Sequence, residues 1–400
     1  MTVGRLEDVP VERLLVLRDT AGLRALERVG PGDIGPRATD RPPAPLHLDV
    51  EEDVTADDRA EIHADPAVLA SSPVMPIRLI EPAAAGAPSL GTGVAWGVVE
   101  VGAAASSYTG DGVSVAVLDT GVDSSHPAFD GVQISAQTFV GGDVHDRRGH
   151  GTHCAGTVLG RDVGGLRIGV ARGVSRLFAG KVLDDDGGGT TEALFEGLLW
   201  AAAQDVQVVS MSLGFDFPGL VAEMIDAGWP PALATSAALQ TYTATLRLLD
   251  TTIALIRQRE TVVVAAAGNE SRRDLGPRNV LTASLPAAAT GVLSVAAANR
   301  TAGSQLDIGL FSNGQPRVSA PGVGITSAQP GGTLIDMDGT SMAAPHVAGV
   351  AALWWEAIRA EGLPATADTV MAKVVATARA DRFVAGTGVE ARGAGVVTAP

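Results

Sequence analysis

The sequence predicts an α/β fold, in which helices cover both faces of a mostly parallel central sheet and a small α+β module precedes it. Four short segments are apolar on both faces of an extended strand: 113–118, 207–211, 261–266 and 291–296. Such runs are typical of parallel strands that are covered on both sides. Helix-forming segments accompany them at 191–205, 232–257 and 341–360. The 400 residues and 46% hydrophobic content allow one large domain with a full-sized core and one small domain.

The first 85 residues have a different pattern and are predicted to form the small module. Strands are expected at 13–17, 46–50 and 74–80. A helix is expected from Thr55, whose side chain can cap it, through Ala64. Residues 81–92 are small residues, prolines and glycines, which predict a linker. We therefore divide the chain into the module with its linker at 1–85 and a large domain at 86–400.

The charge and cysteine content exclude several classes of function. A net charge of -16 disfavours nucleic acid and anionic membrane surfaces as partners. The single cysteine, Cys154, excludes an intrachain disulfide and a Cys-rich zinc site. The N-terminus lacks the basic start and apolar run of a secretory signal, and no apolar stretch reaches about 18 residues. We expect a protein that is cytoplasmic or exported by a non-standard route; the sequence does not identify the compartment.

Four motifs place chemically active side chains where strands end or helices begin. Asp119 ends an apolar strand and precedes a glycine turn. His153 lies in the Gly-His-Gly-Thr-His-Cys-Ala-Gly motif at 149–156, where a helix is expected to begin at His153. Ser341 lies at the start of an Ala-rich helix, and Asn269 follows Gly268 after another apolar strand. Segments at such positions commonly present functional groups.

These residue types together suit nucleophilic catalysis. A serine hydroxyl is a weak nucleophile and needs a neighbouring base, which histidine supplies. We predict that Ser341 attacks, that His153 accepts its proton, and that Asp119 orients His153. The Asn269 amide and the Ser341 N–H would then stabilise the oxyanion.

The order Asp119, His153, Ser341 is that of subtilisin, and the sequence resembles the subtilisin-like serine peptidases of the subtilase family. The resemblance covers about 96–399, and the motif at 149–156 is most similar to the proteinase K branch. It implies a subtilisin-like fold and a serine endopeptidase that is made as an autoprocessed zymogen. It also implies that residues 1–85 are an inhibitory prodomain, whose tail at 74–87 lies in the active-site cleft.

The resemblance further implies a cleft in which an extended peptide lies between two strands. These strands match Gly187, Gly188 and Gly189 on one side and Ser212, Leu213 and Gly214 on the other. Ala265, Ala266 and Gly268 would line the first pocket with small residues, which favours an apolar or medium-sized residue before the scissile bond. The expected partners are polypeptide substrates and the chain's own prodomain.

No cofactor is expected to be required. Members of the family often bind calcium, but the loop at 160–169 is short and Asn299 stands where an acid is common in the proteinase K branch. Because a hard cation favours carboxylates, both departures argue against calcium. His153, His150, Cys154 and His145 could instead form a metal cluster, but adjacent residues of a helix point to different faces, so no metal site is predicted.

The segment at 215–231 is longer than is usual in the family and is rich in apolar residues. It is therefore expected to shape the cleft or an interface. Two other functions stay open at this point. One is a binding module whose cleft stays occluded by its own prodomain, and the other is an esterase with the same triad.

Overall fold

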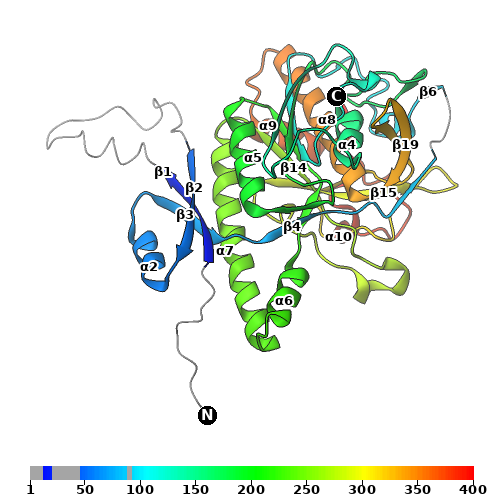
Figure 1. The fold of residues 1–400 in the computed structure, drawn as a ribbon. Helices are drawn as coiled ribbons and strands as arrows, with labels where there is room; N and C mark the ends of the chain where they lie inside the picture. Colours follow the sequence, from blue (N-terminus) through cyan, green and yellow to red (C-terminus); the bar gives the residue numbers. More distant parts are fainter. Residues whose placement is uncertain (1–11, 20–45, 88–91) are drawn as a thin grey trace. The chain divides into compact units, whose positions relative to one another are not determined.

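The computed structural model describes residues 12–19, 46–87 and 92–400. These residues form two compact units: one contains the described residues up to 76 together with 217–252, and the other contains those from 77 to 216 together with 253–400. Figure 1 shows both units and the labels of their elements. The prediction of an α/β fold is confirmed.

The second unit is built on an eight-stranded sheet. Its strands pair in the order β16 (Leu306–Ile308), β15 (Val292–Arg300), β14 (Val262–Ala266), β12 (Val208–Met211), β7 (Ser114–Asp119), β10 (Arg176–Lys181) and β8 (Gln133–Thr138), and β17 (Val318–Pro321) also pairs with β15. All of these pairings are parallel except that of β16. The four apolar runs of the sequence are β7, β12, β14 and β15.

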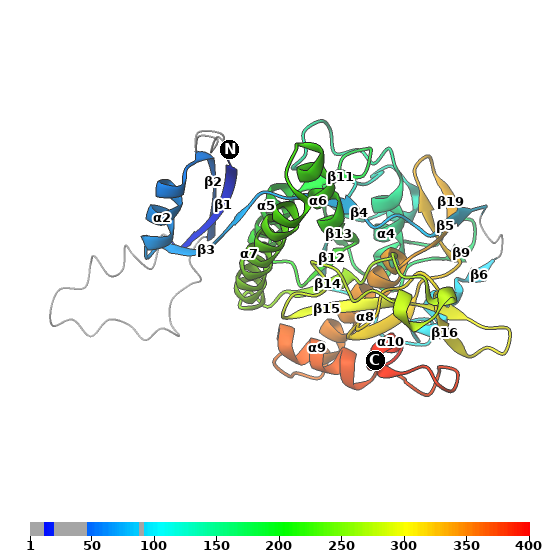
Figure 2. The same ribbon diagram turned by 90° about the horizontal axis from the view of Figure 1, so that it is seen from below.

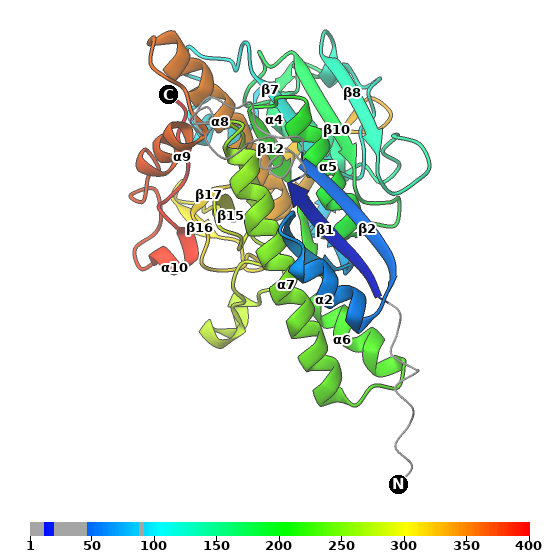
Figure 3. The same ribbon diagram turned by 90° about the vertical axis from the view of Figure 1, so that its left-hand side faces the viewer.

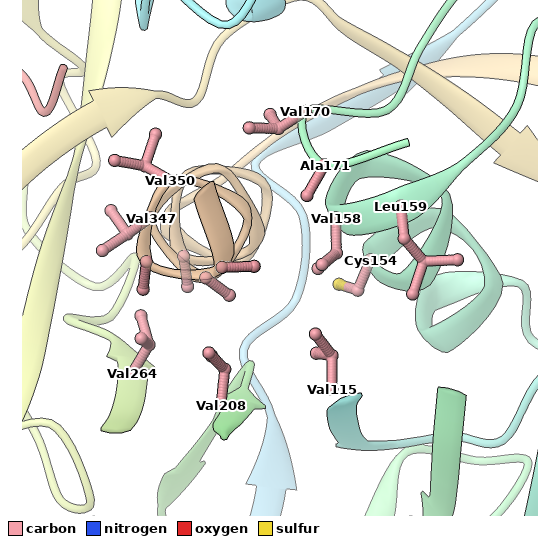
Figure 4. Packing of buried hydrophobic residues seen from close by; sticks show 14 of the residues in the cluster. Val115, Cys154, Val158, Leu159, Val170, Ala171, Val208, Val264, Val347 and Val350 are labelled. Carbon is pink, nitrogen blue, oxygen red and sulfur yellow. The ribbon is translucent and has the colours of Figure 1, made fainter. Parts of the chain in front are cut away.

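Helices cover both faces of this sheet. On one face, α4 (His150–Leu159) and α8 (Thr340–Ala360) lie side by side over β7, β12 and β14, and Figure 4 shows their valines around Val115 and Val208. On the other face, Leu118 of β7 lies against Gly197 of α5 (Thr191–Ala203). Successive strand residues point to opposite faces, so a strand that is apolar throughout serves both layers. Helices α9 (Ala367–Ala376) and α10 (Val389–Arg392) complete the C-terminal part (Figure 2).

The first unit contains an antiparallel sheet in the order β2 (Leu46–Val54), β1 (Glu12–Asp19), β3 (Val68–Pro73). Helix α2 (Ala56–Ala64) covers one face, where Ile62 packs on Leu14 and Val16. As expected, Thr55 caps this helix, in a reciprocal pair with Asp58. A strand does lie within the predicted segment 74–80, but its assignment to the small module is wrong: the small sheet uses 68–73, and β4 (Pro76–Leu79) joins a different sheet.

The segment at 215–231 forms helix α6 (Phe217–Asp226), and α7 (Pro231–Arg257) follows it. Figure 3 shows α6 beside the first half of α7, where the rings of Phe217 and Tyr242 pack edge to face. The other face of the small sheet meets α7, because buried Ser72 of β3 lies 2.7 Å (Oγ to Oγ1) from Thr245. The inserted segment is thus part of the unit that contains the N-terminal module.

Three small sheets lie around the larger one. They are β11 (Gly188–Thr190) with β4 and β13 (Leu213–Phe215), then β18 (Ile325–Gln329) with β19 (Thr333–Asp338) and β5 (Ala84–Gly86), and finally β6 (Gly93–Val94) with β9 (Leu166–Arg167). The segment predicted as a linker therefore contains a paired strand, β5. Across the described residues, no helix is both long and apolar enough to span a membrane.

Candidate active site

Strand β4 lies between the two segments that the sequence suggested as walls of a peptide cleft. It pairs antiparallel with β13, with Arg78 opposite Gly214 and Leu79 opposite Leu213. On its other side, the Leu79 N–H donates to the Gly187 carbonyl at 2.8 Å. Glycines leave backbone groups accessible on both sides, so residues 77–79 are held as the middle strand of a three-stranded sheet.

Ser341 lies where this strand leaves the sheet. It is buried in the first turn of α8, and its Oγ donates to the Ile80 carbonyl at 3.1 Å. The start of the helix is fixed from outside, because the Thr340 N–H and Oγ1 both donate to Asn269 Oδ1 at 2.9 Å. These bonds position the serine beside a peptide carbonyl.

Asn269 also contacts the bound segment. Its Nδ2 donates to the Glu81 carbonyl at 2.8 Å, one residue beyond the carbonyl at Ser341. Because Oδ1 is held by Thr340, the amide group is oriented with its N–H side toward the chain in the cleft. A fixed donor of this kind can stabilise charge on a carbonyl oxygen.

The residue paired with Asp119 is His150. Asp119 ends β7, and its Oδ1 accepts from His150 Nδ1 at 2.7 Å, with both side chains at most 2% exposed. Gly149 precedes His150 at φ 92, in the left-handed region that favours glycine, and a Cβ there would lie 3.1 Å from Pro330 Cδ. This turn sets the imidazole at the first position of α4, over the end of β7.

The prediction that Asp119 orients His153 is therefore wrong. Helix α4 begins at His150, three residues earlier than expected, so His153 lies nearly one turn further along. Its Nε2 donates to the Ile325 carbonyl at 2.9 Å, in β18. Both histidines of the motif are buried, and the sequence alone did not show which one faces the carboxylate.

The two histidines have opposite electrostatic environments. Burial disfavours the imidazolium of His150, but the interactions with Asp119 and Cys154 together outweigh burial and raise the pKa of His150 well above 6.5. His153 has no carboxylate partner in the described residues, and its burial lowers the pKa to about 3. Of the two, only His150 has a carboxylate that stabilises its protonated form, as a base that takes a proton during the reaction requires.

Cys154 links the parts of the site. Its thiol lies 3.8 Å from His150 Nδ1 and 3.4 Å from the Ser341 carbonyl. The Ser341 carbonyl also accepts a hydrogen bond from Ser212 Oγ at 3.1 Å. Burial raises the pKa of the Cys154 thiol above 9.0, so the group is a neutral thiol at neutral pH. Through Cys154, the Asp119–His150 pair and the first turn of the Ser341 helix are in contact with the same side chain.

A buried carboxylate that the sequence reading missed supports this arrangement. Asp146 accepts from the Gly149 N–H at 2.7 Å and from the N–H and hydroxyl of Thr152, at the start of α4. Its other contact is Thr120 Oγ1 at 2.9 Å, next to Asp119. Asp146 thus joins the end of β7 to the start of α4. An acid just before a helix start is the signal that could have identified it.

The Ile80 side chain is buried next to Gly214. It is 3% exposed and belongs to the main buried cluster, which also contains Ala266. A Cβ added at Gly214 would lie 3.5 Å from Ile80 Cγ1, which is ordinary van der Waals distance and makes the two residues neighbours. Ala265 is buried in the neighbouring strand, and Gly268 precedes Asn269 at φ 114.

Asn299, which stands where an acid is common in the proteinase K branch, lies in β15 opposite Asp307. In the acidic loop at 184–186, Asp184 accepts from the N–H groups of Asp186 and Gly188. Among described residues, one group could hold a metal ion: Asp119, His150 and Cys154. Its members form the carboxylate–imidazole pair described above.

A carboxylate–imidazole pair and a serine hydroxyl directed at a peptide carbonyl define a serine-type endopeptidase. The chain belongs to the subtilase family, since the model described as "Subtilase family" matches residues 110–395. Subtilisin DY of Bacillus licheniformis is 35% identical over 225 residues, 55% of this chain and 69% of that protein. Subtilisin BL of Lederbergia lenta is 36% identical over 54% of this chain and 67% of its own length. The thermostable alkaline protease of Halalkalibacterium halodurans is 34% identical, and the match covers 47% of its length.

Proposed function

We propose that this protein is an endopeptidase made as a zymogen, which cleaves its own Ile80–Glu81 bond through Ser341, His150 and Asp119. One observation carries the proposal: the Ser341 hydroxyl lies 3.1 Å from the Ile80 carbonyl of a strand held on both sides. The sequence-based interpretation of residues 1–85 as an inhibitory prodomain agrees with this placement of its tail. Further polypeptides would bind in the same cleft once residues 77–80 leave.

The proposed reaction follows the usual sequence for acyl transfer. Ser341 Oγ attacks the carbonyl carbon of Ile80, and His150 takes the hydroxyl proton at Nε2. Asp119 holds the Nδ1–H and stabilises the imidazolium. Asn269 Nδ2 and the Ser341 N–H donate to the oxyanion. His150 then gives its proton to the leaving Glu81 amine, and water releases the acyl group by the same steps. The proposed reaction uses only these side chains and water, and requires no cofactor.

The neighbouring Glu81–Pro82 bond is the competing cleavage site, because Asn269 contacts the Glu81 carbonyl. Two observations favour Ile80–Glu81. The Ile80 side chain is 3% exposed and suits the small apolar pocket expected before the scissile bond, whereas the Glu81 side chain is 59% exposed. Proline also restricts the residue before it and has no N–H. We therefore assign the cleaved bond to Ile80–Glu81, with the Glu81 amine as the leaving group.

The test is a matched set of variants of the full chain: Ser341→Ala, His150→Gln and His153→Gln. The first two should stay at full length and lose about 10⁶-fold in peptide turnover, the loss measured for the corresponding residues of subtilisin itself. His153→Gln keeps a side-chain donor for the Ile325 carbonyl and should retain turnover within about tenfold, with thermal melting to confirm folding. Intact mass and N-terminal sequencing should give a mature chain that begins at Glu81. Normal turnover in His150→Gln would contradict the assignment.

A second function is favoured by the same observation. Because residues 77–81 fill the cleft, a chain that never cuts them would act as an occluded binding module. Wild-type protein that stays at full length and resists labelling by a fluorophosphonate would support this alternative.

A further inference from the structure

Two charged side chains of the cleft contact charged residues of the bound segment. Arg148, two residues before His150, donates from Nη2 to both carboxylate oxygens of Glu81, at 2.6 and 2.7 Å. Arg148 Nη1 also donates to the Asp186 carbonyl at 3.3 Å, and its side chain is 31% exposed. The guanidinium is therefore held at the edge of the cleft, on the side that receives the residue after the scissile bond.

The second pair lies on the other side of that bond. Asp216 follows β13 directly, and its Oδ2 lies 2.6 Å from Nε of Arg78. Asp216 is 18% exposed, whereas Arg78 is 64% exposed. Since Arg78 pairs with Gly214, the backbone register of β4 brings this cation to the carboxylate. The two residues between the charged ones, Leu79 and Ile80, are apolar and buried.

We infer that Arg148 and Asp216 are specificity-determining residues. Arg148 selects a carboxylate on the residue directly after the scissile bond, and Asp216 selects a cation on the third residue before that bond. This inference rests on the proposed function, in which the Ile80–Glu81 bond is cut. The substrate class is thus a cationic residue, two apolar residues and then an acidic residue. Exchanging the two charges in a peptide would place like charges together at both positions, which disfavours it further.

The size of the effect follows from exposure. Partly exposed ion pairs contribute modestly, so loss of either peptide charge should lower kcat/KM about two- to fivefold. Charge reversal adds repulsion and should lower it about tenfold. Salt screens such pairs, so the preference should shrink in about 1 M NaCl. The backbone pairing that holds any extended peptide is unaffected.

The experiment uses mature enzyme and quenched fluorescent peptides that contain the sequence of residues 77–83. One series has Glu, Gln or Lys at the position of Glu81, and another has Arg, Gln or Glu at that of Arg78. Wild type should prefer Glu and Arg, Arg148→Glu should reverse the first preference, and Asp216→Lys should reverse the second. Arg147→Glu is the matched control, because Arg147 pairs with Asp143 and Asp185 instead of the bound segment.

The outcomes separate this inference from the proposed function. Turnover of all peptides at equal rates, or an equal change of preference in Arg147→Glu, would overturn the inference and leave the endopeptidase intact. No turnover of any peptide by a chain that also fails to process itself would overturn the proposed function. A preference that follows the charge of residues 148 and 216 supports both.

Discussion

At the scale of single residues, the working histidine is distinguished by its partner. His150 and His153 are both buried and lie in one motif, yet their pKa values move in opposite directions. The main structural difference is the 2.7 Å bond between His150 Nδ1 and Asp119 Oδ1, because His153 has no carboxylate partner in the described residues. Motif spacing gave the residue types correctly, but only the start of α4 at Gly149 decides which imidazole meets the carboxylate.

This contrast predicts the pH dependence of turnover. A general base works when deprotonated, so activity should fall as the pH decreases through the pKa of His150, with a midpoint above 6.5. The measurement is kcat/KM against pH for a peptide without ionisable side chains. Activity that persists at full level down to a pH near 3 would instead match His153 as the base.

At the scale of elements, strands were predicted where apolar runs are long and helices where periodicity is clear. β7, β12, β14, β15, α5, α7 and α8 agree with the expected segments within a few residues. Strand β3 was missed because its residues, Val-Leu-Ala-Ser-Ser-Pro, show no continuous apolar face. Strand β4 lies within the predicted strand at 74–80, but its partner β13 is far along the chain and local sequence does not reveal the pairing. Strand β5 was predicted as part of a linker, because its pairing with β19 is also distant in sequence.

For helix α6 the sequence predicted two possible roles, in shaping the cleft or in an interface. It and α7 line a groove of about 440 Å³ with Arg59 of α2 and Pro73 of β3. Five residues of the inserted segment line the groove: Leu220, Met224 and Trp229 are half-buried, and Glu223 and Ala227 are exposed. This composition supports an interface with the N-terminal module, within one compact unit.

We therefore expect Met224→Asp to weaken retention of the N-terminal module after processing. Half-burial of a methionine contributes about 1 kcal/mol, so release of the 1–80 fragment should be at least about fivefold faster. The lag before peptidase activity appears in a processing time course measures this release. Leu239→Asp is the matched control, because Leu239 is a 55% exposed residue of α7 outside the groove. Equal lags in both variants would assign α6 no part in retention.

At the scale of the whole molecule, two buried neutral histidines make stability depend on pH. Burial lowers the pKa of His153 to about 3 and that of His346 to about 4. Below 6.5 the unfolded chain takes up protons at both positions while the folded chain does not, so the free energy of unfolding falls as the pH falls. His150 adds no slope in this window, since its raised pKa keeps it protonated in the folded chain and a pH below 6.5 keeps it protonated in the unfolded chain.

The expected loss is about 1.4 kcal/mol per pH unit for each of these histidines between pH 6.5 and about 4. Urea unfolding of the Ser341→Ala chain at several pH values measures it without self-cleavage. His153→Gln in that background should reduce the slope by about half. A free energy of unfolding that stays constant across this window would show that the two imidazoles are accessible to protons in the folded chain.

Strand β5 affects what happens to the two new chain ends. Ala84–Gly86 pairs with Asp336–Asp338 of β19, and the Ala83 N–H donates to the Asp338 carbonyl at 2.7 Å. After cleavage at Ile80–Glu81, the freed Glu81 amine would stay tethered three residues from this pairing, next to the acyl group on Ser341. Its effective concentration would be in the millimolar range or higher, so resealing of the bond would compete with hydrolysis. The step that makes maturation irreversible would then be the opening of the three β5–β19 residue pairs, and not the cleavage reaction.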